Sequence, residues 1–184
     1  MSYTNTTQVL QQLGSSVVNG GRRILRNFKP YPATTSRNTL FKSMDYLVTT
    51  SDSGVSIEFV FGSADDYWQF VDKGVRGAKP SKHKGRPRAQ VSPFKFSTKM
   101  PPRKAIDRWV VRKPLKAARG EDGKFIARKS LVFAIQKTIF EKGIHRTQFF
   151  TRPYETALSV YEDRILEALA LDLEGQIETI IDEI

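Results

Sequence analysis

The sequence has no cysteine among its 184 residues and only two histidines, His83 and His145. The absence of cysteine excludes a disulfide framework, a cysteine-ligated zinc site and a cysteine nucleophile, and it fits a reducing compartment. Neither histidine has a second histidine or a carboxylate cluster at the spacing that metal ligands need. We therefore expect no metal site and no cofactor.

Motifs of common enzymes are also missing. The sequence contains no phosphate-binding loop, no dinucleotide-binding glycine pattern and no nucleophile elbow of the serine hydrolases. Asp65-Asp66 is the only acidic pair that suggests a metal, and a helix N-terminus explains it better because acidic side chains stabilise that end of the helix dipole. We predict a protein without catalytic activity.

No apolar run approaches the roughly 18 residues that a membrane-spanning helix needs. The N-terminal stretch MSYTNTTQVLQQLG is polar and lacks the apolar core of a signal peptide. We expect synthesis in the cytoplasm and no membrane partner. With 39% hydrophobic residues, the chain is long enough for one compact domain with a core but too short for two full domains.

Charge is abundant and unevenly spread. The net charge is +11, yet residues 73–129 alone hold 19 Lys and Arg against 3 acidic residues, or +16. From Pro153 to the C-terminus there are nine acidic residues and one arginine, or −8. Three interpretations stay open: a solvated basic surface, a surface that faces phosphates or acidic groups, and pairing of the acidic tail of one copy with the basic segment of another.

Hydrophobic periodicity predicts an α+β fold: a small antiparallel sheet, the hairpin 44–61, packed with helices, plus a long C-terminal helix. The strands are 44–50 and 55–61, joined by the turn Ser51-Asp52-Ser53-Gly54. Helices are expected over residues 7–28 with a possible break near Gly20, and over 64–73, 102–113, 126–142 and 153–184.

We expect three parts: an N-terminal helix and connector over 1–34, a core α+β domain over 35–165, and an acidic helical extension over 166–184. The core would contain a basic loop, 75–101, that is rich in proline and glycine and has few apolar residues. Residues 77–92 cannot offset their own ordering entropy, so we expect them to become ordered only in an assembly.

The candidate site residues form two groups. Contacts with nucleic acid or an acidic partner are expected from the basic residues Lys79, Lys82, Lys84, Arg86, Arg88, Lys95 and Lys99. A subunit interface is expected from the C-terminal helix, whose apolar stripe continues beyond the needs of one domain, and from Trp68, which lies beside the apolar stripe Tyr67, Phe70 and Val71 of its helix. The predicted interface residues are Trp68, Ile177, Ile180, Ile184, Glu174 and Glu178.

Several segments also follow one another in a distinctive order over about residues 35–165. They are Thr39-Leu40 with Ser43, the run Tyr67 to Gly74, Met100-Pro101-Pro102, and Leu131 to Gly143 followed by Phe149-Phe150 and Pro153. In this order they resemble the tail-completion and head–tail joining proteins of tailed bacteriophages. The basic insertion at 77–95 and the extended acidic C-terminus depart from the simplest members of that family.

The resemblance implies a structural virion protein at the head–tail junction, present in the host cytoplasm during assembly. Its subunits would form a sixfold or twelvefold ring around the DNA channel, as a neck or connector ring, a tail terminator or a tail-completion protein. The expected partners are further copies of the chain, portal, neck or tail-tube proteins, and packaged DNA through nonspecific contacts.

The alternative is a basic nucleic-acid-binding module without catalytic activity. In that case Phe94, Phe96 and Trp109 would stack on bases beside the phosphate contacts. A small nuclease is a third class, but the sequence lacks the carboxylate cluster that would hold its metal. The mass of the native particle separates these classes, because a ring and a monomer differ severalfold.

Overall fold

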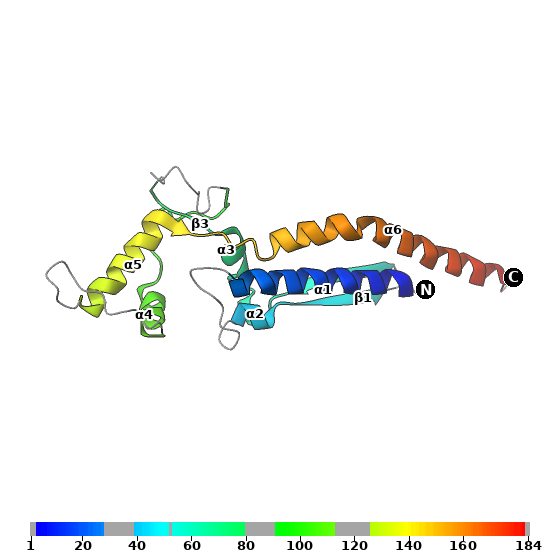
Figure 1. The fold of residues 1–184 in the computed structure, drawn as a ribbon, viewed down its shortest axis with the longest axis horizontal. Helices are drawn as coiled ribbons and strands as arrows, with labels where there is room; N and C mark the ends of the chain where they lie inside the picture. The colour runs from blue at the N-terminus through cyan, green and yellow to red at the C-terminus, as the bar shows by residue number, and fades with distance from the viewer. Residues whose placement is uncertain (1–2, 28–38, 52, 80–90, 113–125, 183–184) are drawn as a thin grey trace. The chain divides into compact units, whose positions relative to one another are not determined.

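The structure is a computed structural model that describes residues 3–27, 39–51, 53–79, 91–112 and 126–182. The fold is α+β, as predicted: it combines a two-stranded antiparallel hairpin with helices, and a long helix lies near the C-terminus (Figure 1). The chain divides into two compact units. Unit 1 comprises residues 1–72 and 147–184, and unit 2 comprises residues 73–146.

This division differs from the predicted three parts. The N-terminal helix and the C-terminal helix are not appendages of a central domain, because they pack on each other within unit 1. Unit 2 is an insertion between two segments of unit 1. No local pattern in the sequence links residues 4–27 to residues 151–182, because the two helices are paired by tertiary contacts.

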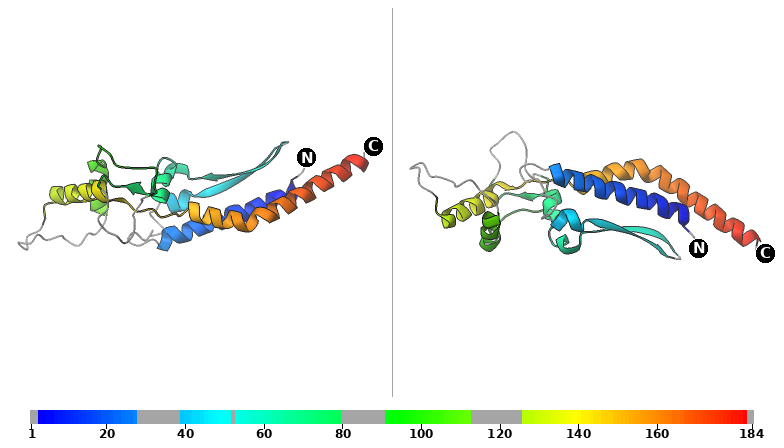
Figure 2. Two further views of the ribbon diagram at one scale, coloured as in Figure 1. Left: turned by 90° about the horizontal axis from the view of Figure 1, so that it is seen from above. Right: turned by 60° about the horizontal axis from the view of Figure 1, so that its bottom comes forward.

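Unit 1 contains both long helices and the hairpin. Its elements, in chain order, are α1 (Thr4–Asn27), α2 (Thr39–Ser43), β1 (Asp45–Ser51), β2 (Gly54–Val60), the short 3-10 helix η1 (Gly62–Ala64), α3 (Trp68–Lys73, whose last residue counts to unit 2) and α6 (Thr151–Asp182). Both α6 and the hairpin pack on α1, and two further views show α1 and α6 side by side (Figure 2).

Helix α1 is continuous from Thr4 to Asn27, without the break near Gly20 that the sequence left open. Its glycines serve close packing instead. The space that a side chain at Gly14 would fill is taken by the Tyr46 ring, and Met44 crowds Gly21 in the same way. Glycine lowers the stability of a helix, but at these two positions a larger residue would clash with the side chain that packs against the α1 backbone.

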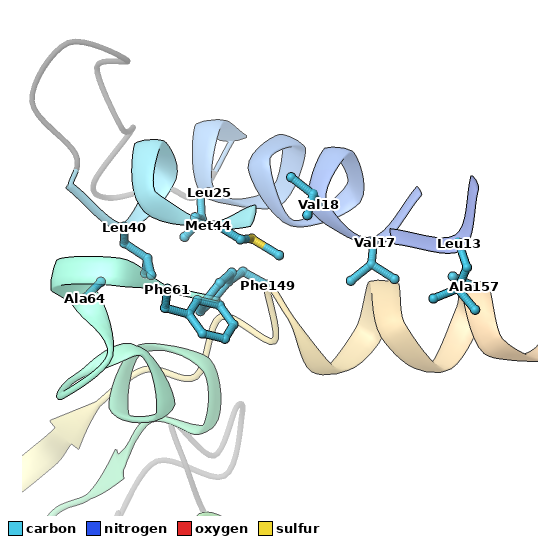
Figure 3. Close-up of a cluster of buried hydrophobic side chains, with 10 residues drawn as sticks. All are labelled: Leu13, Val17, Val18, Leu25, Leu40, Met44, Phe61, Ala64, Phe149 and Ala157. Carbon is cyan, nitrogen blue, oxygen red and sulfur yellow. The ribbon is translucent and has the colours of Figure 1, made fainter. Parts of the chain in front are cut away.

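The hairpin has the predicted alternation. Tyr46 pairs with Phe59 and Val48 with Ile57, and these four side chains lie on the face toward the rest of unit 1, while their neighbours in sequence lie on the opposite, more exposed face. The hydrophobic core lies where α1, α2, the end of the hairpin and the start of α6 meet, as Figure 3 shows. Its buried members are Leu13, Val17, Val18, Leu25, Leu40, Met44, Phe61, Ala64, Phe149 and Ala157.

Unit 2 has a smaller core. Its elements are β3 (Val75–Arg76), α4 (Arg103–Arg112), α5 (Arg128–Lys142) and β4 (Gly143–Ile144). Helices α4 and α5 pack on each other, and Ile106 and Val132 are the buried side chains that they contribute. Strands β3 and β4 pair antiparallel and are only two residues long.

Candidate functional site

Charge is segregated between the two units. Unit 2 has 22 Lys and Arg against 4 Asp and Glu, a net charge of +18. Unit 1 has 8 Lys and Arg against 15 Asp and Glu, a net charge of −7. Each unit therefore has a strong electrostatic preference of its own, and the two preferences are opposite.

The described part of unit 2 has few acidic groups, and those it has are already paired. Asp107 accepts two hydrogen bonds from the Arg128 guanidinium, at 2.9 and 2.6 Å. Glu141 accepts one from Lys79 Nζ at 2.7 Å, and this bond lowers the pKa of the Glu141 carboxyl. The other cations in the described part of unit 2 thus have no acidic side chain left there to neutralise them. They are available to an outside anion.

An exposed face of helix α5 carries such cations around an apolar side chain. On α5, Lys129, Phe133 and Lys137 follow one another at four-residue spacing, so they lie on one side of the helix, and all three are exposed. We call these three residues the α5 face. The spacing is present in the sequence, but the predicted apolar stripe of this helix consists of Ile126, Leu131, Ala134, Ile135, Ile139 and Phe140. Four of these residues are half-buried, whereas Ile126 and Ala134 are exposed and Val132, outside the predicted stripe, is buried.

The predicted basic contacts are only partly described. Lys79, Lys95 and Lys99 are exposed, and Lys79 is engaged with Glu141 as stated above. Lys82, Lys84, Arg86 and Arg88 lie outside the described residues, as does most of the segment 77–92.

The backbone around Lys95 is anchored within unit 2. The amide of Arg76 donates to the Phe94 carbonyl, and the amide of Phe96 donates to the Arg76 carbonyl, both at 2.9 Å. The Phe96 ring lies 6.2 Å from the Phe140 ring, centroid to centroid. Phe94 and Phe96 are half-buried, so packing within the unit takes up part of the surface that base stacking would need.

The predicted interface residues fall in two places. The Trp68 ring stacks on Phe61, with centroids 4.2 Å apart, and it packs against the core of unit 1. Tyr67 and Phe70, which we expected on the inner face of this helix, are exposed instead. Helix α3 begins only at Trp68, after a 3-10 turn, and it packs on the core with Trp68 together with Val71, of which only Val71 belonged to the predicted stripe.

The C-terminal half of α6 exposes a line of apolar side chains. They follow at spacings of four, three, four and four residues, so they share one side of the helix, and we call them the α6 stripe: Leu166, Ala170, Leu173, Ile177 and Ile181. The predicted Glu174 and Glu178 are exposed beside the stripe. Ile177 is 58% exposed, whereas the side chain of Ile180 and all of Ile184 lie outside the described residues.

Asp172 is the last buried side chain of α6 among the described ones, and it caps the other long helix. Its carboxylate accepts hydrogen bonds from the backbone amides of Asn5 (3.0 Å) and Thr6 (2.8 Å), and from both of their side chains (2.9 and 2.7 Å). These amides belong to the first turn of α1, which has no internal partners for them. Residues beyond Asp172 therefore run past the start of α1 (Figure 1).

Asp72 plays the same role at the start of α6. Its fully buried carboxylate accepts from the amides of Phe150 (2.8 Å) and Thr151 (3.2 Å) and from the Thr151 hydroxyl. Its backbone carbonyl accepts from the amides of Thr147 (3.1 Å) and Gln148 (3.0 Å), which closes the base of the inserted unit 2. Sequence reasoning assigned no role to either aspartate. Asp72 stands two residues before Gly74 in the run Tyr67 to Gly74, whereas no local pattern distinguishes Asp172 from the other acidic residues between Pro153 and the C-terminus.

Among the described residues, no three histidine, aspartate or glutamate side chains come together as metal ligands would. Over the same residues, no helix has the length and apolar character needed to cross a membrane. Comparison of the chain with known proteins found no matching family model, no similar curated protein and no similar solved structure.

Proposed function

We propose that this chain is a non-catalytic structural protein that associates with copies of itself and binds nucleic acid through its basic unit 2. The observation that carries this proposal is the separation of charge into a +18 unit and a −7 unit within one chain. Opposite surfaces on the same molecule favour head-to-tail contacts, and such contacts close into rings when the rotation allows it.

The resemblance of residues 35–165 to phage head–tail joining proteins supports a location for this protein in the virion. A ring around a DNA channel needs cations that touch phosphates without reading sequence, because the DNA must pass through. The exposed cations in the described part of unit 2 that have no acidic partner there suit that purpose. We therefore propose a subunit of the ring at the head–tail junction of a tailed phage, as a connector, terminator or completion protein.

The test is the mass of the native protein, measured by sedimentation or native mass spectrometry over a range of concentrations. A discrete ring, with binding of duplex DNA that weakens steeply as salt rises, supports the proposal. A monomer that binds DNA would instead favour the nucleic-acid-binding module. Sustained cleavage of DNA or of a nucleotide by clean protein would overturn the non-catalytic assignment.

A further inference from the structure

Two exposed helical faces of this chain match each other in composition. The α6 stripe presents apolar side chains bordered by the exposed acids Glu174 and Glu178. The α5 face presents Phe133, which is 51% exposed, between Lys129 and Lys137. One face is apolar with negative neighbours, and the other is apolar with positive neighbours.

We propose that the α6 stripe of one copy docks on the α5 face of a neighbouring copy. This inference rests on the self-association proposed above, and it names the two surfaces that meet. Phe133 would enter the α6 stripe near Leu173 and Ile177, while the two lysines approach the carboxylates of Glu174 and Glu178.

The α6 stripe is long enough to cover the α5 face. From Leu166 to Ile181 the α6 stripe rises fifteen residues, or about 22 Å at 1.5 Å per residue. From Lys129 to Lys137 the α5 face rises eight residues, or about 12 Å. Apolar groups on both sides would leave water together, which is the main source of association free energy, while the charges set the orientation.

The molecule that docks on the α6 stripe is a second copy of this chain rather than an unrelated protein. The reason is that the chain itself carries both complementary surfaces, the α6 stripe and the α5 face. The stripe is also free for this purpose within unit 1. Its part beyond Asp172 lies past the last described buried residue of α6, and its apolar side chains Leu173, Ile177 and Ile181 are 44%, 58% and 64% exposed.

Charge reversal tests the pairing. In one variant Glu174→Lys and Glu178→Lys reverse the acidic border, and in a second variant Lys129→Glu and Lys137→Glu reverse the basic one. Each variant alone should associate at least about tenfold more weakly than the wild type, because like charges then face each other. An equimolar mixture of the two should regain association, since every contact between unlike variants pairs opposite charges. Circular dichroism of each variant confirms that it is folded.

The apolar part has a matched control on the same helix. Ile177 lies in the α6 stripe and is 58% exposed, whereas Val160 lies outside it and is 60% exposed. Ile177→Ser should weaken association, and Val160→Ser should leave it unchanged. Equal effects of the two substitutions would overturn the assignment of the stripe.

The remaining outcomes separate this inference from the proposed function. If the wild type is a monomer at all concentrations, self-association itself fails. If the wild type assembles and the reversal variants assemble equally well, only the α6–α5 pairing fails. Loss of association in each variant without recovery in the mixture also overturns the pairing. If Lys129→Glu with Lys137→Glu weakens DNA binding alone, the α5 face belongs to nucleic acid.

Discussion

Two aspartates, Asp72 and Asp172, each cap a helix that begins far from them in the sequence. Both are buried, and both direct their carboxylate oxygens at backbone amides that the helix leaves unsatisfied. A charged acceptor in that position forms stronger hydrogen bonds than a neutral one and also stabilises the helix dipole.

Replacing Asp72 should destabilise unit 1 strongly. Asp72→Ala leaves the amides of Phe150 and Thr151 buried without an acceptor, which should cost about 2–4 kcal/mol. Asp72→Asn retains one acceptor oxygen and should cost less. Urea denaturation measures both, and Asp66→Asn, at an exposed position, is the control. Equal midpoints for wild type and Asp72→Ala would contradict the capping role.

Asp172 should make stability depend on pH in the acid range. Burial raises the pKa of its carboxyl, but the four hydrogen bonds from Thr6 and Asn5 lower it more, so that the pKa lies below the ordinary value. The folded chain therefore binds this proton less readily than the unfolded chain. The stabilisation is present above the unfolded pKa of about 3.9 and is lost as the pH falls below it.

The variant Asp172→Asn isolates this effect. Between pH 6 and pH 2.5, the free energy of unfolding from urea titrations should fall less in the variant than in the wild type, because the variant has no such proton to bind. Identical pH profiles would show that Asp172 makes no contribution of this kind.

At the scale of elements, local patterns predicted the fold well. The alternation in β2 and the turn residues before Gly54 placed the hairpin within one residue at each end, because strand period and turn chemistry are local properties. The five predicted helices match α1, α3, α4, α5 and α6 to within four residues at each end, whereas the short helix α2 was not predicted. The inward side of α3 was predicted only in part. Val71 packs inward as expected, but Trp68 rather than Tyr67 or Phe70 joins it, because the Trp68 ring packs on Phe61 and Phe150, which lie outside the helix.

The candidate site was less accessible to sequence reasoning. The acidic border of α6, Glu174 and Glu178, was expected beside Ile177 because helical spacing is a local property. The α5 face was missed because which side of α5 is buried depends on where α4 packs. The cap by Asp172 depends on a contact between residues 166 positions apart, which no local pattern reports.

The last residues of α6 should matter for association and not for folding. Deleting residues 175–184 removes Ile177 and Ile181 but leaves Asp172 and the core of unit 1 intact. Full burial of such a side chain contributes roughly 1.5–3 kcal/mol, so association should weaken, and it should weaken more at low salt, where the lost charge pairing is least screened.

Sedimentation reports the assembly of the truncated chain and circular dichroism reports its fold. If the truncated chain assembles normally but melts far below the full-length protein, residues 175–184 belong to the stability of unit 1 instead.

At the scale of the whole molecule, unit 1 should fold without unit 2. Replacing residues 73–146 by a short Gly-Ser link leaves 110 residues of unit 1, plus the link. Because the Asp72 carbonyl and the Thr147 amide are already hydrogen-bonded at 3.1 Å, a few residues can join the two ends without distortion. Circular dichroism should show a cooperative thermal transition, and DNA binding should be lost with the +18 unit. A chain that aggregates or lacks a cooperative transition would contradict the independence of unit 1.

The hydrogen bonds at the base of unit 2 also bear on how such a protein can change over generations. Closing a chain segment costs free energy that grows only with the logarithm of its length, by about 0.6 kcal/mol for each doubling. Since Asp72 holds both ends of the inserted segment, insertions and deletions inside it leave the cap on α6 untouched. Selection can therefore alter the length and charge of the basic unit while the α1–α6 scaffold stays constant.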